Sequence, residues 1–86
     1  MNKERLHRLE LVLNTLQGAY KDLIVISEEE DHYFNNMPDN KSGSELADLT
    51  VRNAEDIGAA VYDLSIVIDI IRNVVNSNQC FSPADS

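Results

Sequence analysis

Hydrophobic residues recur along the first third of the chain with the period of an α-helix. Steps of three and four residues separate Leu6, Leu9, Leu13, Leu16, Tyr20 and Leu23. Such steps bring side chains to one face of a helix with 3.6 residues per turn. Because Pro38 disfavours helical geometry at the preceding residue, the pattern predicts a helix over about residues 3 to 35. Asn35 and Asn36 can close this helix in the left-handed conformation.

A second helix is predicted after a connection of turn-forming residues at about 36 to 43. Ser42, followed by Glu45 three residues later, matches a capping box. From about residue 44 to 77, two interleaved series with a seven-residue period supply the hydrophobic positions: Ala47, Ala54, Val61, Ile68 and Val75, and Thr50, Ile57, Leu64 and Ile71. This heptad spacing is typical of a helix that packs against another helix. Residues 78 to 86, which include Pro83, are predicted to form a flexible tail.

Two helices of similar length with a short connection predict an all-α fold, an antiparallel two-helix hairpin. If the turn centres near Asp39 and Asn40, the numbers of facing residues sum to about 79. This register places Tyr20 opposite Gly58, Ala59 and Ala60, so that a large ring meets small residues.

The hydrophobic positions are too many for one hairpin, because each helix then has only one neighbour. Ile66 and Ile70 lie off the heptad series, and Leu11 and Val25 lie off the main stripe of the first helix. We therefore expect self-association into a helical bundle, most simply a homodimer. The expected oligomer interface comprises Val61, Leu64, Ile66, Val67, Ile68, Ile70, Ile71 and Val74. The alternative is a monomer with scattered exposed hydrophobic residues.

Length and charge narrow the possible functions. Eighty-six residues predict one domain, and a net charge of −8 argues against direct binding of nucleic acid or of an anionic membrane. No hydrophobic stretch resembles a signal peptide or a transmembrane helix, so a cytoplasmic location is expected. The single cysteine, Cys80, cannot form an internal disulfide bond.

The acidic residues are concentrated around the expected bend. Residues 28 to 63 contain ten acidic and two basic residues, which accounts for the whole net charge of −8. Four of these acids end the first helix, where the helix dipole disfavours them. Next to them lie hydrophobic groups, and together they form a candidate partner-binding surface for a host protein with a basic surface: Glu28, Glu29, Glu30, Asp31, Tyr33, Phe34 and Met37. The alternatives are that the acids only solubilise the bend and that the aromatic residues only cover the end of the core.

A second hypothesis is an oligomer that sequesters a small nucleotide at subunit junctions. Arginine pairs with phosphates and tyrosine stacks on bases, which makes Arg52, Tyr62 and Arg72 candidate ligand-binding residues. For Arg72, a simple surface pair with Asp69, three residues away, is the alternative.

A third hypothesis concerns paired carboxylates. Glu45-Leu-Ala-Asp48 has the E-x-x-D spacing of helical nucleotide pyrophosphohydrolases and resembles MazG in this respect, with Glu28 and Asp31 as a second pair. The resemblance implies Mg²⁺-dependent hydrolysis. The chain departs from that family because Asp31 replaces a glutamate and the pairs flank a proline turn.

His7 and His32 are 25 residues apart without a nearby nucleophile. We therefore expect no enzyme activity, no catalytic residue, no metal site and no cofactor.

The segment from Glu28 to Ser44 resembles small phage-encoded helical-hairpin proteins. The shared features are an acidic helix end, an aromatic residue, the sequence Asn36-Met-Pro-Asp-Asn40, and a second helix that starts with serine. The resemblance implies an accessory protein that blocks a host enzyme or defence system, either by stoichiometric binding or by sequestering its signal, and it identifies no functional residue.

Overall fold

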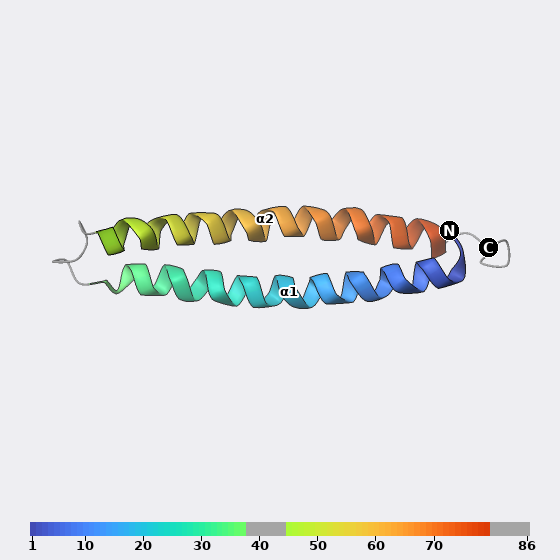
Figure 1. The fold of residues 1–86 in the computed structure, drawn as a ribbon, viewed down its shortest axis with the longest axis horizontal. Coiled ribbons are helices and arrows are strands. Elements are labelled where there is room, and N and C mark those ends of the chain that lie inside the picture. Colours follow the sequence, from blue (N-terminus) through green and yellow to red (C-terminus); the bar gives the residue numbers. More distant parts are fainter. Residues whose placement is uncertain (38–44, 80–86) are drawn as a thin grey trace.

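The computed structural model describes residues 1–37 and 45–79 of the chain. Helix α1 (Lys3–Asn35) and helix α2 (Glu45–Gln79) lie side by side in antiparallel directions (Figure 1). The predicted all-α hairpin is therefore confirmed. The proposed capping serine Ser42, the centre of the turn, and residues 80 to 86 with Cys80 lie outside the described residues.

The ends of α1 are capped by asparagine side chains. At the start, the Asn2 Oδ1 atom accepts a hydrogen bond of 2.8 Å from the Arg5 backbone N–H. At the end, the Asn36 backbone N–H and side-chain Nδ2 both donate to the His32 carbonyl, at 3.1 and 2.8 Å. Asn36 has φ −102° and ψ 8°, and no described residue has a positive φ. The expected left-handed closure is therefore wrong, because the Asn36 side chain satisfies the terminal carbonyl without it.

Helix α2 extends to Gln79, whereas the sequence pattern predicts an end near residue 77. The Asn78 Nδ2 atom donates to the Val74 carbonyl at 2.8 Å, and the Gln79 Nε2 atom donates to the Glu10 Oε2 atom at 2.9 Å. The second bond crosses from α2 to α1. These contacts add hydrogen bonds that hydrophobic periodicity does not reveal.

The heptad series of α2 forms the seam against α1. Ala47, Thr50, Ile68 and Val75 are buried, and the other five positions of the series are half-buried. In α1, Leu13 is buried and clusters with Ile68 and Val75. Six residues with large hydrophobic side chains pack around this cluster: Leu6, Leu9, Leu16, Tyr20, Leu64 and Ile71.

The register of the two helices differs from the predicted one. Leu13 of α1 clusters with Ile68 and Val75 of α2, so it faces the point midway between them, near Ile71. Tyr20 packs against the same cluster and lines a groove with Ser65 and Ile68, so it lies by the turn around Leu64 and not by the segment from Gly58 to Ala60. Facing residue numbers therefore sum to about 84, a shift of about five residues. The prediction was wrong because the meeting of hydrophobic layers, and not the midpoint of the connection, sets the register.

The molecule is a rod with extents of 66 × 15 × 14 Å. Its radius of gyration is 19.1 Å, against about 12 Å for a compact domain of this length. We call residues 3–23 and 61–79 the open half and residues 24–37 and 45–60 the bend half. Within the described residues, no helix is both long and apolar enough to cross a membrane.

Candidate functional site

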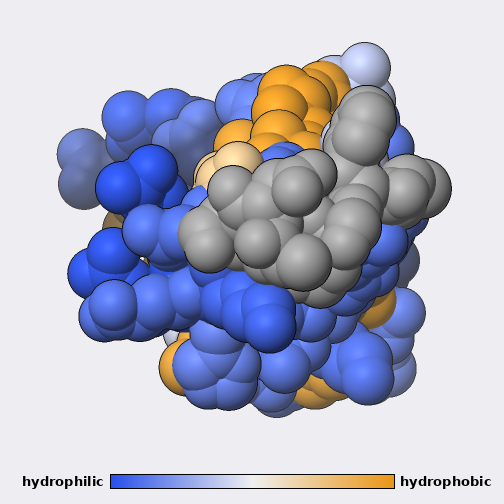
Figure 2. Space-filling model, turned by 90° about the vertical axis from the view of Figure 1, so that its right-hand side faces the viewer, coloured by the Kyte–Doolittle hydropathy of each residue, from blue (hydrophilic) through white to orange (hydrophobic). Residues whose placement is uncertain are grey.

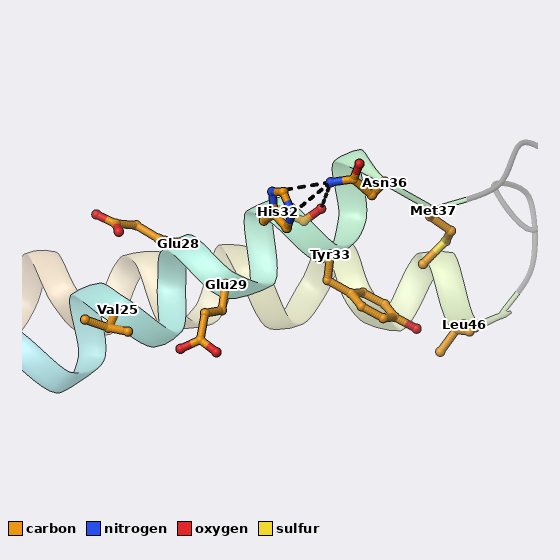
Figure 3. Close-up of a pocket in the computed structure, with 8 residues that line it drawn as sticks. All are labelled: Val25, Glu28, Glu29, His32, Tyr33, Asn36, Met37 and Leu46. Atoms are coloured by element: carbon orange, nitrogen blue, oxygen red, sulfur yellow. Dashed lines mark hydrogen bonds between the residues drawn. The ribbon is translucent and has the colours of Figure 1, made fainter.

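A groove lies at the bend, where α1 ends and α2 begins. Its volume is about 710 Å³. Seven of the lining residues belong to the last turns of α1 and the residues after it, and one belongs to the first turn of α2 (Figure 3): Val25, Glu28, Glu29, His32, Tyr33, Asn36, Met37 and Leu46. We refer to this site as the bend groove.

Helical spacing brings the α1 residues of the bend groove together. Val25, Glu29 and Tyr33 are four residues apart, so they lie one above the other on one face. Leu46 precedes the α2 seam residue Ala47. Tyr33 precedes Phe34, which continues the seven-residue spacing of the α1 stripe from Tyr20 although it is exposed. Since Tyr33 and Leu46 line the same groove, positions that precede the seam in either helix share one flank of the rod.

The bend groove exposes hydrophobic surface. Val25 is 53% exposed, Tyr33 51% and Leu46 43%. Met37 is half-buried beside them, and Figure 3 shows the Tyr33 ring extending toward Met37 and Leu46. Because these side chains come from both helices, a single partner group that enters the groove contacts both ends of the connection.

Two exposed carboxylates, Glu28 and Glu29, give the groove its negative charge. The ion pair found within residues 1–37 and 45–79 joins Arg72 and Asp69, in the open half. Neither carboxylate therefore has an ion-pair partner among the described residues. At the groove edge, His32 and Asn36 are held together by the Asn36 Nδ2 bond of 2.8 Å to the His32 carbonyl.

The predicted partner-binding residues divide into two groups. Glu28, Glu29, Tyr33 and Met37 line the bend groove, whereas Glu30, Asp31 and Phe34 do not. Four consecutive residues point in directions about 100° apart around a helix, so an acidic run cannot form one surface. Glu30 continues the seven-residue spacing of Leu9, Leu16 and Leu23, which makes it a seam position of α1, and it is half-buried.

Sequence reasoning missed four residues of the bend groove: Val25, His32, Asn36 and Leu46. Val25 was noted only as lying off the main stripe. The usable signal is that Val25 precedes Glu29 and Tyr33 at four-residue steps. Leu46 could be assigned to the same groove only with the register of the two helices known.

The residues considered for a nucleotide do not converge on one chain. Arg52 and Arg72 are 20 residues apart on α2, or about 30 Å along its axis. Tyr62, which is 67% exposed, lies between them. Arg72 lines a second groove of about 560 Å³ on the open half, and its Nη1 atom lies 3.1 Å from the Asp69 carboxylate. The rest of that groove is formed by Gln17, Tyr20, Lys21, Ser65 and Ile68.

The carboxylates considered for Mg²⁺, Glu28 and Asp31 on α1 and Glu45 and Asp48 on α2, are all exposed. Glu45 and Asp48 lie outside the α2 seam. No three or more His, Cys, Asp or Glu side chains of residues 1–37 and 45–79 form a group that could hold a metal ion.

The predicted oligomer interface is shared with the hairpin itself. Ile68 is buried and Val61, Leu64 and Ile71 are half-buried in the seam with α1. The remaining four residues are exposed: Ile66, Val67, Ile70 and Val74.

Comparison with known proteins gives no match to the chain, either among protein families, among curated proteins or among solved structures.

Proposed function

We propose that the chain is a non-enzymatic, phage-type accessory protein that inhibits a host enzyme or defence system by stoichiometric binding. The partner is a host protein with a basic surface, and it docks into the bend groove. The observation that carries the proposal is the combination of half-exposed Val25, Tyr33 and Leu46 with the exposed carboxylates Glu28 and Glu29 in one groove. The resemblance of residues 28 to 44 to phage-encoded hairpin proteins supports the proposed origin.

The carboxylates and the hydrophobic side chains of the bend groove support different steps of binding. Residues 28 to 63 carry the whole net charge of −8, so their field attracts a basic partner and accelerates its encounter. Hydrophobic anchors buried in a pocket supply most of the affinity of protein interfaces, and Tyr33 is an anchor of the preferred type. A partner that presents a hydrophobic side chain flanked by Lys or Arg fits this groove.

The proposal is tested first by site-specific cross-linking in bacterial cells. A photoreactive amino acid replaces either Tyr33 in the bend groove or Tyr62, which is 67% exposed on the outer side of α2. We expect a discrete cross-linked protein from position 33 and not from position 62. Equal labelling at both positions would contradict a groove-specific contact.

Affinity of the purified partner is then measured by calorimetry. Glu28→Lys combined with Glu29→Lys is expected to weaken binding by about tenfold or more, because the substitutions reverse two charges at the contact. The matched control is Glu55→Lys combined with Asp56→Lys, which makes the same change in net charge on exposed positions of α2 outside the bend groove. If both pairs weaken binding equally, the acids act only through net charge and the docking site is refuted.

A further inference from the structure

Helix α2 carries a second hydrophobic stripe outside the seam. Val67, Ile70 and Val74 are separated by three and four residues, so they lie on one face, and they are 42%, 58% and 37% exposed. Val67 and Val74 each precede a seam residue. Since successive residues of a helix are rotated by about 100° around its axis, the stripe faces away from the seam by about this angle. In Figure 2, which looks along the rod, hydrophobic atoms gather on the α2 side of the molecule. We name these three residues the α2 stripe.

The first helix extends this surface. Val12 is 47% exposed and precedes the buried seam residue Leu13. Positions that precede the seam share one flank of the rod, as Tyr33 and Leu46 show in the bend groove. Val12 therefore lies on the same flank as Val67 and Val74. The surface around the α2 stripe is thus built by both helices in the open half.

The hairpin alone leaves much surface exposed. Within the described residues, the buried hydrophobic side chains are Leu13, Ala47, Ile68 and Val75. A core of this size is small for a chain of 86 residues, and oligomerisation is a common way for small domains to bury further hydrophobic surface. A two-fold contact covers the same exposed side chains on both copies at once, so a second copy of the chain suits the α2 stripe.

We infer that the α2 stripe and Val12 form a two-fold symmetric contact with a second copy, and that the two bends lie at opposite ends of the resulting dimer. Charge determines the orientation. Helices in contact are about 8 to 10 Å apart, so a dimer with both bends at one end sets two regions of net charge −8 side by side. Like charges at that spacing repel within the Debye length.

The position of the α2 stripe determines the overlap. With the symmetry axis near Ile70, Val67 of one copy faces Val74 of the other and hydrophobic groups meet throughout. Sliding the copies to full overlap would instead place the stripe against the stretch around Asn53 and Asp56. The contact is therefore limited to the open halves. The dimer is about 100 Å long, against 66 Å for one hairpin.

The surface is tested by measuring mass in solution at several concentrations. The wild-type chain is expected to have twice its mass of 9.7 kDa. Ile70→Glu is expected to weaken dimerisation by about 100-fold or more, because symmetry places the charge in the contact twice. The control Tyr62→Glu changes an exposed residue on the other flank and should leave the dimer intact. A monomeric wild type, or an Ile70→Glu variant that dimerises like the wild type, would overturn the proposal.

The orientation is tested by disulfide cross-linking in a Cys80→Ser background. Ile70→Cys is expected to cross-link with its counterpart, since both lie near the symmetry axis. Leu49→Cys, 47% exposed in the bend half, is the control because its counterpart lies about 60 Å away. Efficient cross-linking through position 49, or none through position 70, would refute the arrangement with bends at opposite ends. These results do not depend on whether the bend groove binds a partner.

Discussion

The open half and the bend half share one heptad pattern but fill it with different side chains. In the open half, the core cluster consists of Leu13, Ile68 and Val75. In the bend half, the buried seam positions are Ala47 and Thr50, and the α1 seam position Glu30 is half-buried. The spacing of the pattern therefore sets the path of the helices, whereas the size and polarity of the side chains decide which half stabilises them.

The two halves also differ in where they bury hydrophobic side chains and where they expose them. A fully buried large aliphatic side chain contributes about 1.5 to 3 kcal/mol to folding, and the buried side chains of this type lie in the open half of the described residues. The bend half holds the acidic residues and exposes Val25, Tyr33 and Leu46. Substitutions in the bend groove are therefore expected to have little effect on the fold.

The unequal contribution of the two halves to stability is tested most directly by truncating one buried residue in each half. Ile68→Ala is expected to lower the free energy of unfolding by about 3 kcal/mol, because Ile68 is 4% exposed and a cavity remains. Thr50→Ala should lower it by less than about 1 kcal/mol, since the Thr50 Oγ1 atom bonds the Leu46 carbonyl of its own helix at 2.8 Å. Urea unfolding followed by circular dichroism at one protein concentration measures both. Equal losses would mean that the halves contribute alike.

A substitution that makes the bend half resemble the open half tests the same comparison in the other direction. Glu30→Leu places an aliphatic side chain at a half-buried seam position and should raise the free energy of unfolding by about 1 kcal/mol. Glu29→Leu is the matched control, because it removes the same charge from the same helix end at an exposed position. Thermal and urea unfolding provide the readout. A gain of the same size in the control would assign the effect to charge and not to packing.

The smallest expected effect concerns the ion pair of the open half. The Arg72 Nη1 and Asp69 Oδ1 atoms are 3.1 Å apart, and the two side chains are 44% and 70% exposed. A double-mutant cycle with Asp69→Ala and Arg72→Ala should give a coupling of about 0.3 kcal/mol that salt reduces. A coupling above about 1 kcal/mol would show that charges, and not only hydrophobic layers, hold the open half.

The fold followed from the sequence because helical periodicity is a local property. The interleaved series from Ala47 to Val75 predicts the α2 seam, and each of its positions is buried or half-buried. The sequence did not predict that Tyr20 lies by Leu64. The register between the helices depends on how the hydrophobic layers of two separate segments meet. Leu46 was not assigned to the bend groove because its place there also depends on the register of the two helices. Tyr33 and Met37 were assigned to it because they lie close to the acidic run in the sequence.

The placement of Lys3 and Gln79 at the same end of the rod has a mechanical consequence (Figure 1). A pulling force applied at these two residues separates the helices one layer after another, starting with the bond between Gln79 and Glu10. The hydrophobic layers of the open half bear the load first. Once they separate, the smaller and more polar layers of the bend half offer little further resistance. The highest force is therefore expected at the start of unfolding, and the remainder of the hairpin is expected to separate at lower force.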